Sequence, residues 1–337
     1  MTDATSLVEL IRGDMVESTH RGHVVVCDAG GDIIKAWGDP NAVIYPRSAC
    51  KMLQALPLIE SGAAKAAGLQ SRHLALACAS HQGAAMHTEL AQEWLAGLGL
   101  DEHDLRCGPQ IPNDHTARAK MRKAFDQPCQ LHNNCSGKHS GFLTLNKHLA
   151  GGAEYIEIDH PVQKSVRAAH TEMMGAEPAF WGVDGCSAPN FSCEIGHFAH
   201  AMAKMANPEQ LGKTRGAAAK TLISAMIKHP LLVAGETRAC SELMIAAKGK
   251  AAIKTGAEGV FAAILPERGI GVVLKIEDGN FRASEAAMAA ILVRLGVLDA
   301  ADPIVQKRLC PAQLNRRKIA AARIQVNDAV YRGGARL

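Results

Sequence analysis

Two β-hairpin patterns near opposite ends of the chain enclose a long helical middle, and this order most restricts the possible fold. Residues 23–27 and 33–37 are expected strands around a Gly-Gly turn, and residues 259–265 and 270–276 repeat the pattern around a Gly. Ala- and Leu-rich stretches with helical spacing lie between them, at residues 48–68, 87–98, 160–175, 195–206 and 215–232. Because the hairpins are alike in character, the most economical fold pairs them in one antiparallel sheet.

The expected helix at residues 282–296 is amphipathic and would cover a face of that sheet. The sequence therefore predicts an α/β fold with a sheet built from both chain ends and a helical lobe. The α/β sandwich lobe would contain residues 1–47 and 250–337. Residues 48–249 would form the mainly helical lobe. We expect the active site in the cleft between the two lobes, because such clefts are natural binding sites.

Ten cysteines occur among the 337 residues, and none belongs to a Cys-x-x-Cys pair. Residues 1–13 lack the basic start and the apolar core of a signal peptide. The most apolar stretch, residues 286–298, is interrupted by Arg294 and is too short to span a bilayer. We therefore expect a cytoplasmic protein with reduced thiols. Most of these thiols should be buried as small apolar groups.

The charge pattern argues against polyanionic partners. The formal net charge is +4, and no block of Lys and Arg occurs. Neither nucleic acid nor an anionic membrane surface is therefore expected as a partner. Aromatic residues make up only 4% of the chain, so the interior should consist of small and aliphatic side chains.

Arg47-Ser48-Ala49-Cys50-Lys51 contains a Ser-x-x-Lys at the start of an expected helix. A serine and a lysine three residues apart share one helix face. A neutral lysine amine can take the serine proton, and the helix start can stabilise an oxyanion. The motif is short enough to occur by chance. The alternative is that Ser48 only caps the helix and that Lys51 is solvated.

A Lys-Thr-Gly triplet, Lys254-Thr255-Gly256, comes just before the expected strand at residues 259–265. This triplet at a strand edge accompanies Ser-x-x-Lys in penicillin-recognising serine enzymes. The third element of that set, Ser-Asp-Asn or a similar triplet, is absent from the middle of the chain. The penicillin-binding interpretation is therefore incomplete, and a plain turn before the strand is the alternative.

Ser80-His81-Gln82-Gly83 brings a hydroxyl, an imidazole and a flexible Gly together after an apolar run. A second serine near a lysine could relay protons, and His87 follows four residues beyond Gly83. The alternative is a simple capping turn before the helix expected at residues 87–98.

The segment at residues 132–141 is dense in polar groups and glycine, so we expect a break between helices rather than core. It is not a phosphate-binding loop, because Asn133 replaces the required Gly. Cys135 and Lys138 are three residues apart, with His139 adjacent, and such donors suit zinc. A further ligand could be Cys186 or Cys240, since both lie in polar, Gly-containing breaks.

The order of these motifs resembles the rhizobial-type (class 3, asparaginase II) L-asparaginase family, from about Val8 to the terminal helix. The Cys-Ser-Gly-Lys-His segment at residues 135–139 is the most distinctive part. The resemblance implies a fold like serine β-lactamases and glutaminases, hydrolysis of L-asparagine to L-aspartate and ammonia, and a homodimer.

The resemblance also implies roles for individual residues. Two Ser–Lys pairs would be catalytic, Ser48 with Lys51 and Ser80 with Lys254. One zinc ion per chain would be held by Cys135, Lys138 and Cys186. The substrate-binding residues would be Arg47, His139, Asp184 and Cys240. A lysine ligand must be neutral, so metal binding should weaken as the pH falls.

The expected mechanism is an acyl-enzyme route in which Ser48 attacks the amide and Lys51 acts as general base. Asparagine and glutamine differ by one methylene, which the sequence does not resolve. A penicillin-recognising amidohydrolase or a glutaminase is the alternative activity. An alternative of another class is a zinc- or thiol-binding protein without catalysis.

Overall fold

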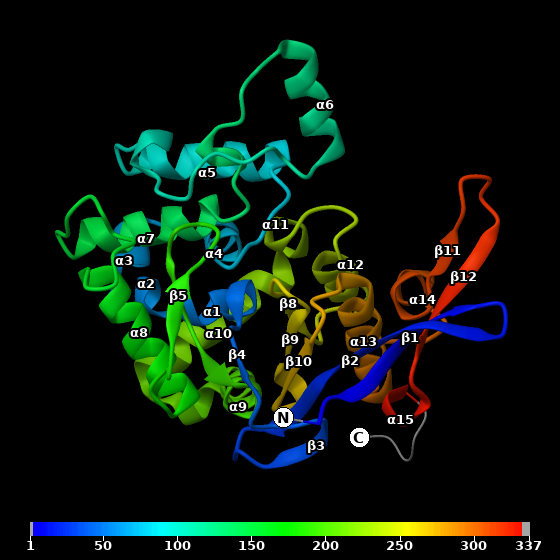
Figure 1. Ribbon diagram of the computed structural model, residues 1–337. Coiled ribbons are helices and arrows are strands. Elements are labelled where there is room, and N and C mark those ends of the chain that lie inside the picture. Colours follow the sequence, from blue (N-terminus) through cyan, green and yellow to red (C-terminus); the bar gives the residue numbers. More distant parts are fainter. Residues whose placement is uncertain (1–2, 332–337) are drawn as a thin grey trace. The chain divides into compact units, whose positions relative to one another are not determined.

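The computed structural model describes residues 3–331, which form two compact units (Figure 1). Unit 1 comprises the described residues of Met1–Ala49, Cys193–Asn207 and Glu242–Leu337. Unit 2 comprises Cys50–Ser192 and Pro208–Ser241. Each unit is described by itself below.

Unit 1 is built on an antiparallel sheet, eight-stranded in the described residues, in which both ends of the chain take part (Figure 1). The strand order is β11-β12-β1-β2-β10-β9-β8, and β3 also pairs with β2. The strands are β1 (Thr5–Arg12), β2 (Met15–Asp28), β3 (Ile33–Trp37), β8 (Ala252–Thr255), β9 (Val260–Leu265), β10 (Ile270–Ile276), β11 (Ala312–Leu314) and β12 (Ala320–Val326).

The two predicted hairpins are present, and they pair with each other. Strand β2 pairs with β3, and β9 pairs with β10. Strands β10 and β2 are antiparallel neighbours in a register that sets Val272 opposite Val26. The predicted fold class, an antiparallel sheet from both chain ends with a helical part, is therefore confirmed.

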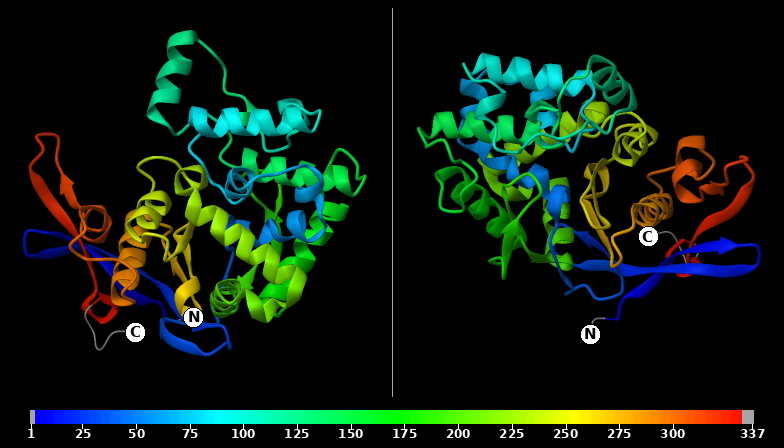
Figure 2. Two further views of the ribbon diagram at one scale, coloured as in Figure 1. Left: turned by 180° about the vertical axis from the view of Figure 1, so that it is seen from behind. Right: turned by 45° about the horizontal axis from the view of Figure 1, so that its top comes forward.

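Helices cover the sheet of unit 1. Helix α9 (Ile195–Ala206) contacts β2, β9 and β10, and α13 (Phe281–Arg294) contacts β1, β9, β10 and β12. Figure 2 shows the orange α13 beside the yellow strands from two further directions. Every residue of β9 is buried, as expected of a strand with both faces covered. The smaller elements of this unit are β4 (Val43–Ile44), β7 (Cys193–Glu194), α14 (Pro303–Leu309) and α15 (Asp328–Tyr331).

Unit 2 is mainly helical, and α7 (Ser136–His148) is its central helix. It contacts α2, α3, α4, α5 and α8. The helices around it are α1 (Lys51–Gln54), α2 (Leu56–Glu60), α3 (Ala63–Ala66), α4 (Ser71–Ala77), α5 (Ala85–Gly97), α6 (His115–Ala124), α8 (Pro161–Met174), α10 (Gly212–Lys228) and α11 (Pro230–Val233). A short hairpin of β5 (Trp181–Val183) and β6 (Pro189–Phe191) completes the unit.

Helix ends in this unit carry the expected signals. The His160 ring nitrogen accepts the Val162 N–H at the start of α8, and Pro161 occupies the first helical position. The same helix ends at Gly175, which has a φ of 74° in the left-handed region. These signals explain why the stretch predicted as helical at residues 160–175 has almost these bounds.

The structure differs from the sequence-based expectations in three places. Residues 193–207 lie in unit 1 instead of the helical part, because the apolar face of α9 packs on the sheet. The expected break at 132–141 contains the start of the buried helix α7. The Ser-x-x-Lys motif does not open a long helix, because residues Arg47–Cys50 form a 3-10 turn and α1 has four residues.

Strands β1, β8, β11 and β12 were not predicted, nor was the β5–β6 hairpin. Among residues 3–331, no helix is both long enough and apolar enough to cross a membrane.

Candidate functional site

Lys51, the lysine of the predicted Ser-x-x-Lys motif, has a buried side chain. It begins α1 and is 1% exposed. Its Nζ lies 2.5 Å from the Ala79 carbonyl oxygen, 3.0 Å from Ser80 Oγ and 3.0 Å from Cys135 Sγ. A neutral amine here could donate to the carbonyl and the sulfur and accept the hydroxyl proton of Ser80. The arrangement therefore suits proton transfer between Lys51 and Ser80.

The loop that carries Ser80 follows α4 and is held by backbone hydrogen bonds from other parts of unit 2. The Ser80 N–H donates to the Val233 carbonyl (2.9 Å), and the His81 N–H donates to the Asn134 carbonyl (3.2 Å). The Arg238 guanidinium lies 3.5 Å from the Ser80 carbonyl oxygen. These contacts hold the loop against the segment that precedes α7, so the Ser80 hydroxyl has a defined position.

His81, from the same motif, has a structural environment. Its Nδ1 accepts the Gly83 N–H, and its Nε2 lies 3.0 Å from Ser136 Oγ. Ser136 gives its only proton to the Leu131 carbonyl, so His81 must donate from Nε2. Burial lowers the pKa of His81 well below its ordinary value. The neutral ring stacks on His87 at 4.7 Å and ties the Ser80 loop to α7.

Cys135, Lys138 and Cys186 come together in unit 2, and each is 3% exposed. Lys138 Nζ donates to Cys186 Sγ at 2.9 Å. The Cys135 N–H donates to Asn133 Oδ1, and its Sγ lies 2.9 Å from Asn134 Oδ1. Cys186 lies in the turn between β5 and β6, in which Ser187 has a φ of 69°.

The protonation of this cluster follows from its contacts. The neighbouring Cys186 sulfur and burial both raise the pKa of Cys135, whereas Cys135 and the Lys138 ammonium lower the pKa of Cys186 against the opposing effect of burial. Burial opposes the charge on Lys138, but the adjacent sulfurs outweigh it, so the Lys138 pKa is raised. The cluster thus combines a sulfur with a raised pKa, a sulfur with a lowered pKa and an amine with a raised pKa.

The side chains of Cys135, Lys138 and Cys186 fit a zinc ion in the type of their donor atoms and in their location. Two thiol sulfurs and an amine meet in a buried place, and sulfur and nitrogen are the atoms that zinc prefers. The third donor is a lysine, and residues 3–331 contain no group of three or more His, Cys, Asp and Glu arranged for a metal. Lys138 would have to lose its proton to coordinate.

Three of the predicted substrate-binding residues also belong to unit 2. His139 follows Lys138 in α7 and is fully buried. Asp184 lies close enough to Lys138 to raise the pKa of that amine. Cys240 is buried in α12 (Ala239–Ala246).

Ser48, Arg47 and Lys254 belong to unit 1. Ser48 lies in the 3-10 turn, and Arg47 has a φ of 50° in the left-handed region. Lys254 is fully buried in β8, the edge strand, and its Nζ donates to the Thr255 carbonyl at 2.7 Å. A Cβ on Gly256 would come 2.7 Å from the Pro46 carbonyl oxygen. The end of β8 and the turn that carries Ser48 therefore lie against each other.

The implied pairs Ser48–Lys51 and Ser80–Lys254 each join residues of different units, and both pairs stay predictions. The contact described for Lys51 is with Ser80. Two residues that hold the site were missed in the sequence. Asn133 orients Cys135, and its place in an Asn-Asn-Cys run was the available signal. Tyr155 contacts His139, but no sequence motif around Tyr155 indicates this, because the two residues meet only in the folded protein.

Comparison with known proteins gives the family. A β-lactamase from Mycobacterium bovis is similar in structure, with a TM-score of 0.44 and 13% identity, covering 78% of this chain and 89% of that chain. The protein Mglu, in its native form in 4.3 M NaCl, also has a TM-score of 0.44 and 13% identity, covering 84% and 63%. A search of curated proteins found no match. The sequence pattern of the L-asparaginase II family matches residues 8–326, nearly the whole chain. The chain therefore belongs to the L-asparaginase II family and is an amidohydrolase of the asparaginase type.

Proposed function

We propose that the enzyme hydrolyses the side-chain amide of L-asparagine to L-aspartate and ammonia by serine–lysine catalysis. The observation that carries this mechanism is the buried Lys51 amine, which has a serine hydroxyl and a thiol at 3.0 Å. Family membership supports the amide substrate class. These contacts of the buried Lys51 amine include no carboxylate, and a buried lysine of this kind is suited to accepting a proton.

In this mechanism Ser48 Oγ attacks the amide carbon of asparagine while Lys51 takes the serine proton. The C–N bond of the tetrahedral intermediate then breaks, and the leaving nitrogen receives a proton and departs as ammonia. Ser80 and Lys254 would relay that proton. The 3.0 Å contact between Lys51 and Ser80 supports the first part of the relay. Water then attacks the acyl-enzyme, and aspartate is released.

We expect the helix start to contribute little to oxyanion stabilisation. Helix α1 has only four residues, and the Ala49 N–H already donates to the Pro46 carbonyl at 3.0 Å. A short helix has a small dipole, and an occupied N–H cannot bind an oxyanion.

We further propose that Cys135, Lys138 and Cys186 hold one zinc ion. A bound zinc ion would supply a Lewis-acidic position for orienting a polar group of the substrate. The chain's own part is to provide two buried sulfurs and an amine, of which Lys138 Nζ and Cys186 Sγ are already in contact. Arg47, His139, Asp184 and Cys240 would bind substrate. A homodimer is the expected assembly, which light scattering would test. The ten free cysteines fit a reducing, cytoplasmic setting.

The decisive test is ammonia release from L-asparagine and L-glutamine by the wild type and by Ser48→Ala, with and without added zinc. We expect release from asparagine to fall by several orders of magnitude in Ser48→Ala, with folding unchanged. Ser165→Ala, which removes a hydroxyl that donates to the Pro161 carbonyl within α8, is the matched control and should keep full activity. Substantial activity of Ser48→Ala would remove Ser48 as nucleophile, and faster release from glutamine would favour a glutaminase.

A further inference from the structure

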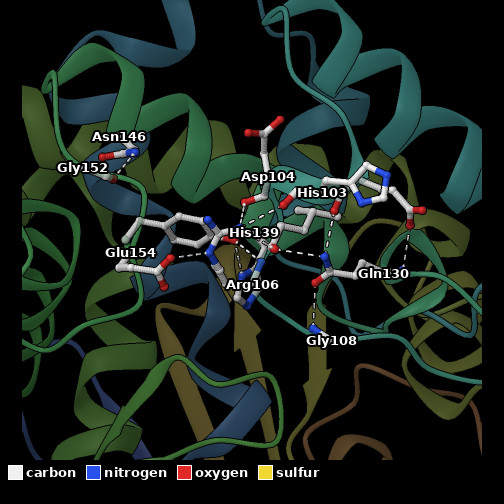
Figure 3. Close-up of polar contacts among 12 residues, drawn as sticks. His103, Asp104, Arg106, Gly108, Gln130, His139, Asn146, Gly152 and Glu154 are labelled. Carbon is white, nitrogen blue, oxygen red and sulfur yellow. Dashed lines mark hydrogen bonds and ion pairs between the residues drawn. The ribbon is translucent and has the colours of Figure 1, made fainter.

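One segment of unit 2 that the proposed mechanism does not use leaves the unit and returns to it at the same place. The Gly108 N–H donates to Gln130 Oε1 at 2.9 Å, and Gln130 Nε2 donates to the Leu105 carbonyl (Figure 3). Asn133 Nδ2 also donates to the Gly108 carbonyl at 3.0 Å. Residues 109–129 therefore form a projection with a fixed base, and helix α6 is its outer part (Figure 1).

Helix α6 has a defined place on this projection. At its start, the Asp114 N–H donates to the Gln82 carbonyl at 2.8 Å. One Asp114 carboxylate oxygen accepts the Gln82 side-chain amide, and the other accepts the Ala117 N–H. At the helix end, the Asp126 N–H donates to the Met121 carbonyl. The Met121 side chain is buried, so this side of α6 faces the protein and the opposite side faces solvent.

Helix α6 contains basic residues but no acidic one. Its four cations are Arg118, Lys120, Arg122 and Lys123. These four charges equal the formal net charge of the whole chain, which is +4. Within residues 3–331, none of the four belongs to an ion pair. Arg118 and Arg122 lie four residues apart on one face, where like charges destabilise a helix. Uncharged residues interrupt these cations in the sequence, and the helix gathers them on one surface.

An exposed aromatic side chain lies at the end of the same helix. Phe125 is 89% exposed, which is the highest value among the large apolar side chains of residues 3–331. It follows Arg122 by three residues and caps the helix. Single exposed apolar residues are ordinary, but aromatic and arginine side chains together are typical of protein–protein interfaces. The combination of an unpaired cationic helix and this ring therefore indicates a surface that binds a partner.

The arrangement favours an acidic protein segment over other anionic partners. A helix on a membrane surface inserts its apolar face into the lipid, whereas the apolar Met121 of α6 is directed to the protein. Single-stranded nucleic acid binds in positively charged grooves with several stacking aromatic side chains, whereas α6 is a projecting helix with one exposed ring. Acidic motifs in proteins are bound by clusters of arginine.

We propose that α6 and Phe125 form a docking surface for an acidic segment of a partner protein. Carboxylates of that segment would pair with the four cations of α6, and an apolar side chain of the segment would cover the Phe125 ring. The charges of the two surfaces are complementary, and the pairing would relieve the repulsion within α6. This surface is independent of the serine–lysine mechanism proposed above.

The probe is a fluorescein-labelled synthetic peptide of glutamates interrupted by leucines. Its binding to the full chain is measured by fluorescence anisotropy at low and at physiological salt. Arg122→Glu/Lys123→Glu reverses two charges of the surface, and Arg122→Gln/Lys123→Gln only removes them. Phe125→Ser removes the aromatic ring. Arg316→Glu/Arg317→Glu is the matched control, because it changes the net charge equally at an exposed turn between β11 and β12.

We expect the wild type to bind the peptide with an affinity that falls as the salt concentration rises. The affinity should be about tenfold or more weaker in Arg122→Glu/Lys123→Glu, because like charges then face each other. Phe125→Ser should weaken binding several-fold at physiological salt, where the ionic contacts are partly screened. The control Arg316→Glu/Arg317→Glu should bind like the wild type. Thermal unfolding of each variant identifies a folding defect, and the glutamine pair decides if the glutamate pair does not fold.

Several results would overturn the inference. These are a wild type that does not bind the peptide, an equal loss of affinity in the Arg316 and Arg317 control, or an unchanged affinity in Phe125→Ser. Tighter binding of a single-stranded oligonucleotide, or of vesicles that contain phosphatidylglycerol, would assign the surface to another class of partner. Active Ser48→Ala enzyme would remove the proposed nucleophile and leave this inference intact, because peptide binding is measured without turnover.

Discussion

Gly137 lies inside the Cys-Ser-Gly-Lys segment, and its lack of a side chain lets α7 approach α4. A Cβ at this position would collide with the carbonyl oxygen and the side chain of Leu76 and would stand 2.9 Å from the Leu76 carbonyl carbon. Real Cβ atoms essentially never come closer than 3.0 Å. Gly137→Ala must therefore push the two helices apart, and the backbone of α4 cannot give way as a flexible side chain would.

The magnitude follows from two opposing terms. Alanine favours a helix over glycine by about 1 kcal/mol. Overpacking a tight interior costs typically 1–3 kcal/mol and sometimes more. The contacts of a Cβ at position 137 would be closer than backbone atoms allow, so we expect an overpacking cost in the upper part of this range. The net loss in the free energy of unfolding should be about 2 kcal/mol. Because Lys138 follows directly, ammonia release should fall as well.

Gly97→Ala is the matched control, since Gly97 is also helical, in α5, and apart from its own helical turn no atom of residues 3–331 would lie within 4 Å of a Cβ added there. The same change there should stabilise the protein by up to about 1 kcal/mol. Urea unfolding and thermal unfolding of both variants, followed by circular dichroism, measure the difference. Equal effects of the two substitutions, or a stabilised Gly137→Ala, would refute the claim that close helix packing explains this glycine.

Three further predictions concern other parts of the molecule. Burial lowers the pKa of His170 to about 4. The unfolded chain binds a proton at this histidine below about pH 6.5, so the free energy of unfolding should fall by about 2 kcal/mol between pH 7.5 and pH 5. Urea unfolding at the two pH values should show a smaller fall for His170→Gln. Asn133→Ala leaves the Cys135 N–H without its acceptor and should cost about 1–3 kcal/mol in thermal unfolding. Gly256→Ala brings a Cβ against the Pro46 carbonyl and should lower kcat for asparagine; an unchanged kcat would contradict this.

The sheet of unit 1 was largely predictable because its strands leave local patterns. Strands β2, β3, β9 and β10 are short apolar runs around glycine turns, and both hairpins were found. Strand β8 was missed because it is only four residues long. Strand β11 was missed because it has three residues and lies at the edge of the sheet. Strand β12 was missed although Ala322, Ile324 and Val326 alternate with exposed residues along it.

The start of α7 could not be recognised from polarity, because its polar groups are satisfied within the protein. Ser140 Oγ donates to the Ser136 carbonyl, and Thr144 Oγ1 donates to the Ser140 carbonyl, each one turn earlier in the same helix. Such bonds let a helix rich in small polar residues be buried at little cost. Composition alone therefore indicated a loop where the protein has its central helix.

By itself, the sequence determined the sheet with both chain ends, the family, and the segments that carry Lys51, Ser80, Cys135 and Cys186. These follow from local periodicity and from residue order, which need no knowledge of folding. Only the tertiary structure decided that Lys51 meets Ser80 and that Tyr155 stands behind His139. These contacts join residues far apart in the chain, and their distances depend on how the helices pack around α7. A buried polar group is active or structural according to its neighbours, and only folding supplies those neighbours.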